Sequence, residues 1–97
     1  MLAQGETLTL ERTLTQADFD AFAALSGDDN PIHVDPAFAA RTRFGRTVSH
    51  GMLLYGLLCA ALAEAAPGAT HLAQELVFPA PTYADEPLRI ALRAAEV

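Results

Sequence analysis

The alternation of apolar and polar residues predicts strands in three parts of the chain. Residues 7–13 alternate with a β-branched bias, which is typical of a half-buried strand. Residues 88–92 alternate in the same way and predict a second strand that reaches almost to the end of the sequence. Residues 72–77 also alternate, and we expect a strand there that Pro79 and Pro81 close, because proline cannot donate to a sheet.

Helical spacing predicts two helices before the middle of the chain. Thr15 and Asp18 form a capping-box-like start, and Gly27 is placed to end this first helix. Its inward residues recur at helical spacing: Phe19, Phe22 and Ala23. Asp35 and Pro36 fit the N-cap and first position of a shorter helix, which we expect to stop near Gly45.

The strongest helical pattern follows Gly51. Five apolar residues fall at i, i+3, i+4, i+7 and i+8: Leu54, Leu57, Leu58, Ala61 and Leu62. The other faces are apolar too, so we expect protein to surround this helix until Pro67 and Gly68 end it. One buried helix against an antiparallel sheet is an α+β arrangement, and residues 1–97 predict a single domain.

Composition limits the possible partners. The net charge of −6 argues against nucleic acid, since phosphate backbones require a basic surface. A hydrophobic fraction of 52% is high for a small monomer and favours a homodimer or larger homo-oligomer. The single cysteine, Cys59, fits a reducing cytoplasm, and the first residues lack the pattern of a signal peptide. The apolar run 52–63 is too short to span a bilayer, so we expect no membrane segment.

Candidate chemistry lies in the turn after the first helix. Asp28 and His33 are five residues apart, and Asn30-Pro31 constrains the turn between them. A carboxylate and an imidazole held together can bind a water and remove its proton. Each also has a structural interpretation, because aspartate stabilises turns and histidine is often a hydrogen-bonded core residue. The spacing favours a site, whereas Asp29 is expected to face solvent.

Three segments together carry a family resemblance. They are the stretches 27–33 (GDDNPIH), 35–39 (DPAFA) and 50–54 (HGMLL). This combination resembles the (R)-specific enoyl-CoA hydratases of the MaoC-like group, from about Phe19 to the end of the chain. The resemblance implies the hot-dog fold, in which a curved antiparallel sheet wraps around one long central helix. It also implies addition of water to a trans-2-enoyl thioester, or the reverse dehydration, with coenzyme A as part of the substrate and no cofactor.

The resemblance assigns roles to individual residues. Asp28 and His33 match the catalytic pair, and Gly51 matches the position whose backbone N–H polarises the thioester carbonyl. Asn30 matches the motif asparagine, which we assign to orientation of the catalytic loop. We expect His50 to cap the helix or pack at its start.

The substrate-facing residues are less sharply defined. Leu54, Leu58 and Cys59 are candidates for lining the acyl pocket, although Cys59 also fits simple core filling. Arg41, Arg43 and Arg46 are either a solvated surface or contacts for the coenzyme A phosphates. No zinc or calcium spacing is present among the acidic and histidine residues, so we expect no metal. The acidic chain favours coenzyme A over an acidic acyl carrier protein as the substrate carrier.

The length departs from the family pattern. A complete hot-dog has strands after the one expected at 88–92, so the C-terminal strands are expected to be missing, and the sheet then requires assembly. An acyl-thioester-binding or assembly subunit without turnover is therefore the alternative function. A thioesterase of the same fold is disfavoured, because the only carboxylate on the long helix, Glu64, lies far from Gly51.

Overall fold

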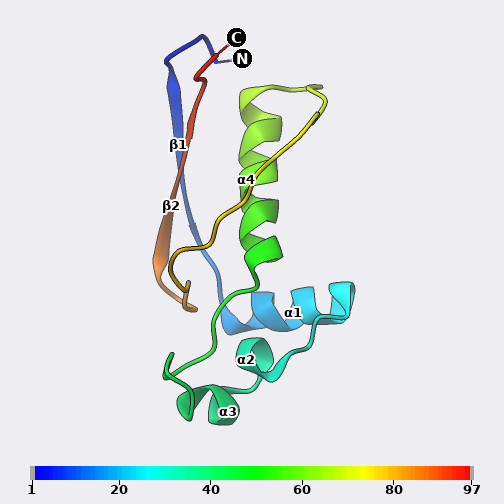
Figure 1. The fold of residues 1–97 in the computed structure, drawn as a ribbon, viewed down its shortest axis with the longest axis vertical. Helices are drawn as coiled ribbons and strands as arrows, with labels where there is room; N and C mark the ends of the chain where they lie inside the picture. The colour runs from blue at the N-terminus through cyan, green and yellow to red at the C-terminus, as the bar shows by residue number, and fades with distance from the viewer. Residues whose placement is uncertain (1, 97) are drawn as a thin grey trace.

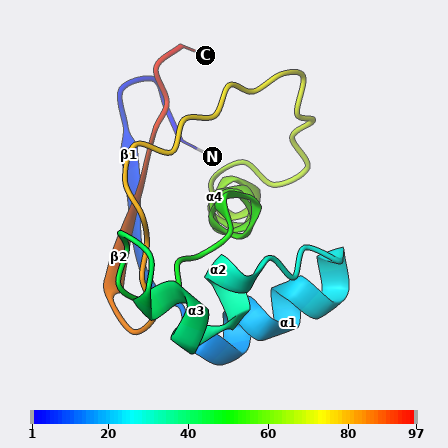
Figure 2. The same ribbon diagram turned by 60° about the horizontal axis from the view of Figure 1, so that its bottom comes forward.

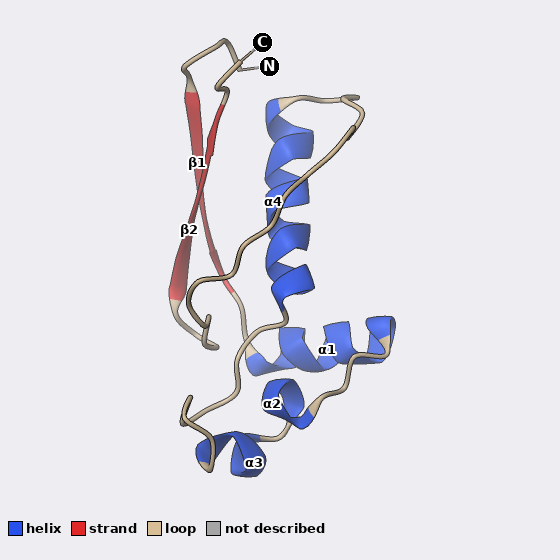
Figure 3. Cartoon of the chain, viewed as in Figure 1, coloured by secondary structure: helices blue, strands red, loops and turns tan. Residues whose placement is uncertain are grey.

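A computed structural model describes residues 2–96 as a two-stranded antiparallel sheet beside one long helix (Figures 1 and 3). Three shorter helices gather at one end of this pair. In chain order the elements are β1 (Thr7–Thr13), α1 (Gln16–Ser26), α2 (Pro31–Val34), α3 (Pro36–Ala40), α4 (Gly51–Ala65) and β2 (Pro87–Arg93). This arrangement confirms the predicted α+β class.

The sheet pairs the two predicted terminal strands. Thr7 lies opposite Arg93 and Thr13 opposite Pro87, in one uninterrupted antiparallel register. The alternating apolar residues of both strands share one face, where Ile90 is buried and lies opposite Leu10. This face is turned toward α4 (Figure 1), so the period-two pattern correctly identified both strands and their inner side.

Helix α1 begins and ends as its sequence indicates. The Thr15 hydroxyl accepts the Asp18 backbone N–H at 3.2 Å, and the Asp18 carboxylate accepts the Thr15 N–H at 2.8 Å. Gly27 follows the helix with a φ of 81°, a left-handed conformation that glycine adopts without strain. Phe19 is fully buried, and it fixes the helix against the rest of the chain.

Two predictions about secondary structure are wrong. Residues 72–77 form no strand: they run as an irregular segment in which Leu72 is 93% and Val77 80% exposed. A strand requires a hydrogen-bonded neighbour, and among the described residues β1 and β2 pair only with each other. Helix α3 ends at Ala40 rather than near Gly45, because the Thr42 hydroxyl donates to the Ala39 carbonyl and starts a series of turns.

Helix α4 has the predicted position but not the predicted burial. Figure 2, which looks nearly along its axis, shows the sheet on one side and the segment after the helix arching around it. Only Ala61 and Ala65 of this helix are buried, whereas Met52 is 54% exposed. The expectation that protein surrounds the helix is therefore wrong for the described chain. No helix among residues 2–96 is both long and apolar enough to cross a membrane.

Candidate active site

The backbone of Asp28, in the turn after α1, is held by hydrogen bonds to both its N–H and its carbonyl. Its backbone N–H donates to the Ser26 hydroxyl at 3.1 Å, and that hydroxyl donates to the Phe22 carbonyl at 2.7 Å. Its own carbonyl accepts a hydrogen bond from the His50 ring at 2.8 Å. The carboxylate itself is about half exposed, so the backbone is fixed while the acidic group remains open to solvent.

His33 is held by a short helix that the sequence analysis missed. Asn30 is the N-cap of α2, accepting the Ile32 N–H at 3.1 Å, and Pro31 is the first helical residue. Asparagine followed by proline is a known start signal, which could have revealed this helix. Asn30 therefore caps the helix that carries His33, and the loop-orienting role expected for it stays a prediction.

The His33 ring has a defined tautomer. Its Nδ1 lies 2.8 Å from the Val48 carbonyl, and because a carbonyl only accepts, Nδ1 carries the hydrogen. In the neutral form of the ring, Nε2 then bears the lone pair. The Gln16 side chain donates to the His33 carbonyl at 2.9 Å, which ties α2 to α1.

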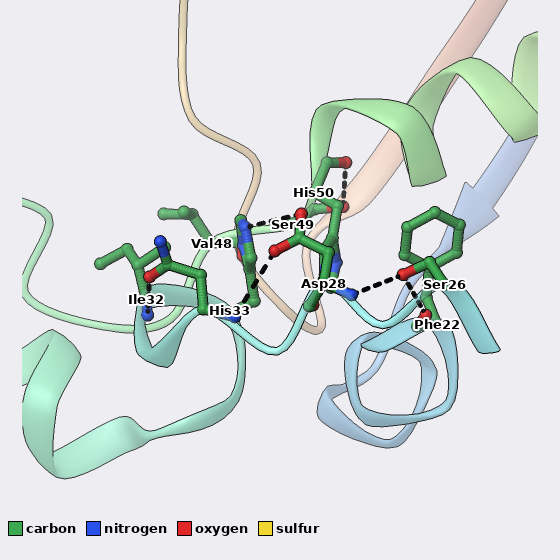
Figure 4. Close-up of polar contacts among 9 residues, drawn as sticks. Phe22, Ser26, Asp28, Ile32, His33, Val48, Ser49 and His50 are labelled. Carbon is green, nitrogen blue, oxygen red and sulfur yellow. Dashed lines mark hydrogen bonds and ion pairs between the residues drawn. The ribbon is translucent and has the colours of Figure 1, made fainter. Parts of the chain in front are cut away.

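The structure brings the predicted pair together. The Nε2 atom of His33 lies 3.9 Å from Oδ2 of Asp28, with the two side chains facing each other across the turn (Figure 4). This separation is too long for a direct hydrogen bond. His33 is largely enclosed while Asp28 is open, so solvent reaches the gap from the carboxylate side.

His50 packs at the start of α4 and does not cap it. Its side chain makes no capping hydrogen bond, and the residue is only 2% exposed. The ring stacks on His33 with centroids 3.8 Å apart and contacts Phe22 edge-on at 4.7 Å. The packing alternative was correct, but no pattern in the sequence indicated the contacts of His50 with His33 and with the Asp28 carbonyl.

Gly51 opens α4 beside a cavity. As the first helical residue it has an N–H without an intrahelical acceptor, and no other acceptor for it occurs among residues 2–96. The cavity, of about 290 Å³, is lined by Gly51 together with Val48, Leu54 and Phe78. A methyl group on Gly51 would lie 3.0 Å from the Phe78 ring, so this wall of the cavity requires glycine unless Phe78 moves.

The other predicted substrate-facing residues are distributed unevenly. Arg43 lines the cavity beside Gly51, whereas Arg46 pairs with Glu86 and stacks on Tyr83. Arg41 lies 6.0 Å from the Phe38 ring and lines neither this cavity nor a second hollow between α4 and β2.

Of the predicted acyl-pocket residues, Leu54 lines both hollows and Leu58 only the one between α4 and β2. Cys59 lines neither of them. A side-chain hydrogen bond with Cys59 raises the pKa of Tyr55, one turn earlier on α4.

Three potential metal ligands also meet here. Asp28, His33 and His50 each offer one ligand atom, and these three atoms lie within 4.8 Å of one another. The two imidazole rings are stacked with centroids 3.8 Å apart and planes only 25° apart, so their in-plane lone pairs lie in two separate, nearly parallel planes. A tetrahedral ion with bonds of about 2.0–2.1 Å needs converging lone pairs. The arrangement fits proton transfer better than metal binding, and the absence of a metal stays a prediction.

Together, the fold and the site define an α+β domain with an Asp–His pair beside the N-terminus of its long helix. A family model described as the MaoC like domain matches residues 2–96, so the chain belongs to this family. The fold is accordingly the hot-dog fold, as the resemblance implied.

Individual relatives agree with this assignment. An (R)-specific enoyl-CoA hydratase from Aeromonas caviae is 44% identical over 84 residues, covering 84% of this chain and 63% of the relative. A 3-hydroxybutyryl-CoA dehydratase from Methylorubrum extorquens is 37% identical over 98 aligned positions, covering 99% of this chain and 62% of the relative. The solved structure of an A. caviae (R)-hydratase involved in PHA biosynthesis superimposes with a TM-score of 0.88 at 38% identity, covering 95% of this chain and 71% of that one. The chain thus spans less than two thirds of the length of these curated relatives.

Proposed function

We propose that this chain carries out (R)-specific hydration of trans-2-enoyl-CoA to (R)-3-hydroxyacyl-CoA, and the reverse dehydration. The observation that carries the proposal is the pairing of Asp28 with a free His33 Nε2 at 3.9 Å. The names of the relatives support it, since they describe a hydratase and a dehydratase acting on coenzyme A thioesters.

The gap between the pair suits one water molecule. For a water about 2.8 Å from both Asp28 Oδ2 and His33 Nε2, the angle at the water oxygen between these two atoms is roughly 90°, near the H–O–H angle of water. It could therefore donate one hydrogen to each residue, with its oxygen lone pairs pointing away toward a substrate. The water oxygen bonds to C3 as the C2=C3 π bond breaks, the pair takes the proton that water releases, and the pair delivers a proton to C2.

The negative charge that builds on the thioester oxygen requires a donor. The free N–H of Gly51 suits this role, because it lies at the positive end of the α4 dipole. Gly51 directly follows His50, which contacts both members of the pair, so His50 links the donor to the acid–base groups. Neither Asp28 nor His33 is among the residues that line the cavity beside Gly51.

The cavity beside Gly51 supports a thioester substrate. Leu54, Val48 and Phe78 give it an apolar wall, and Arg43 adds a positive charge that could contact a phosphate of coenzyme A. Because Arg46 is engaged by Glu86, Arg43 is the stronger candidate for this contact. The net charge of −6 disfavours an acidic carrier protein. A homodimer acting in the cytoplasm belongs to the same proposal.

One observation favours a second candidate function. The apolar side chains of α4 are only partly covered, so an acyl chain could bind there without reaching a complete catalytic pocket. In that case the chain binds acyl thioesters, or assembles with another subunit, without turnover.

Hydration of crotonyl-CoA by the purified 97-residue chain separates these candidates. Loss of the enoyl-thioester absorbance, with a product shown to be (R)-3-hydroxybutyryl-CoA by chiral chromatography, is the expected result. Binding of the saturated butyryl-CoA, measured by calorimetry, is recorded in parallel. Binding without turnover by a folded chain would reject the enzyme and favour the binding subunit.

A further inference from the structure

His50 contacts both members of the proposed catalytic pair with one side chain. Its ring stacks on His33 at 3.8 Å, and its Nε2 lies 2.8 Å from the Asp28 carbonyl. Because that carbonyl can only accept, Nε2 carries the hydrogen and Nδ1 bears the lone pair. The residue is 2% exposed, so these contacts are shielded from water.

Packing alone does not explain a histidine at this position. Its Nδ1 is buried and has no hydrogen-bond partner among residues 2–96. A buried polar atom without a partner lowers stability, so a residue selected only for packing would be apolar. Phenylalanine could stack on His33 and contact Phe22 equally well. Compared with phenylalanine, histidine adds an N–H that donates a hydrogen bond to the Asp28 carbonyl.

We propose that His50 is a positioning residue for the Asp28–His33 pair, an inference that rests on the proposed hydratase function. Ser26 fixes the N–H side of Asp28, and His50 fixes its carbonyl side. With both sides held, the Asp28 carboxylate points to His33. The stacked ring at the same time restricts rotation of the His33 imidazole about its side-chain bonds, so His50 sets the 3.9 Å gap from both directions.

Three variants test this role through turnover. His50→Phe keeps the stacking and loses the donor, His50→Gln keeps a donor near the Nε2 position and loses the ring, and His71→Phe is a matched control on an exposed histidine. We expect His50→Phe to lower kcat about 10- to 100-fold, because small displacements of reacting groups are costly. KM should change little, and His50→Gln should recover part of kcat. Equal losses in the Phe and Gln variants would overturn the role of the donor.

A double variant tests whether His50 acts through Asp28. In an Asp28→Asn background, adding His50→Phe should cost far less than it does in the wild-type chain, because residues that act as one unit are not additive. Full additivity of the two losses would overturn the proposal and assign His50 to general stability, which thermal unfolding of each variant would show as a matching fall in Tm.

A readout without activity keeps this inference separate from the hydratase proposal. The Asp29 amide shares a peptide unit with the Asp28 carbonyl, so its ¹⁵N and ¹H NMR shifts report the hydrogen bond from His50. They should move in His50→Phe, return part of the way in His50→Gln, and stay fixed in His71→Phe. Movement in a chain inert toward crotonyl-CoA would reject the hydratase but retain the positioning of Asp28. Unmoved Asp29 and Asn30 signals in His50→Phe would overturn the positioning role.

Discussion

Two parts of the molecule have irregular backbone, yet they are held very differently. The first is the loop between α1 and α2, which places Asp28 opposite His33. The second is the segment from 69 to 80. The first loop has a capped helix on each side and polar contacts to Ser26, Val48 and His50. The second segment follows α4 with an alternating apolar pattern, but Leu72 and Val77 remain exposed.

The difference shows which kind of order a short chain supplies by itself. Caps, turns and histidine-to-carbonyl hydrogen bonds connect groups within the chain, so the loop that carries Asp28 is fixed by its own chain. A strand needs a neighbouring backbone, and within residues 2–96 the segment 69–80 lacks one. The candidate site therefore lies in the part of the molecule with the greater internal support.

The largest expected effect tests the chemistry of the well-held loop. Asp28→Asn removes the proton acceptor while keeping the shape, and turnover of crotonyl-CoA should fall about 10²- to 10⁴-fold. Asp29→Asn is the matched control, because its side chain is exposed and next in sequence, and it should retain turnover. A similar loss in both variants would show that net charge rather than the Asp28–His33 pair matters.

A second change probes the contact between the segment 69–80 and the start of α4. Gly51→Ala places a methyl group 3.0 Å from the Phe78 ring, which must then move within the cavity. We expect kcat/KM for crotonyl-CoA to fall about tenfold, because the ring would then obstruct the thioester. Phe78→Ala in the same chain should restore most of the loss. A double variant no better than Gly51→Ala would mean that the methyl group itself blocks the backbone donor.

A third change weakens the support of His33. Asn30→Ala removes the N-cap of α2 and should lower the free energy of unfolding by about 1 kcal/mol, measured with urea. Turnover should fall severalfold, since His33 is the third residue of this four-residue helix. Asn30→Ser retains a capping oxygen and should behave nearly as the wild type. Unchanged stability in Asn30→Ala would show that α2 does not depend on its cap.

The smallest effect is expected in the open segment. Leu72→Ser should change the free energy of unfolding by less than about 0.5 kcal/mol, as for other exposed positions. Ile90→Ala is the contrasting control and should cost about 2–3 kcal/mol, because Ile90 is buried between the sheet and α4. A loss above about 1 kcal/mol in Leu72→Ser would mean that another surface covers this segment in solution.

Local signals in the sequence were enough for much of the fold. The capping box at Thr15 and the glycine at position 27 gave the ends of α1, and alternation gave β1 and β2. The same alternation failed at 72–77, because a pattern states which face would be buried but not whether a partner strand exists. Helix α2 was not predicted, because its four residues are too few to show apolar residues recurring at helical spacing.

The candidate site was only partly predictable for a related reason. Asp28 and His33 are close in sequence, so their spacing pointed to a common site, and the structure places them face to face. The hydrogen bond from His50 to the Asp28 carbonyl joins positions far apart in the chain and uses a backbone group. Backbone acceptors are the same at every residue, so no sequence motif reports which one a side chain will find. The roles of these residues remain predictions.

The pairing of β1 with β2 has a consequence for the order of folding. It joins residues near the two ends of the described chain, where the Gly5 N–H also donates to the Ala94 carbonyl (Figure 1). Closing so long a loop is entropically costly and slow, whereas the contacts of α1, α2 and the turn at Asp28 are local. The loop at Asp28 should therefore gain its structure early, and the sheet should close last, as the rate-limiting event of folding.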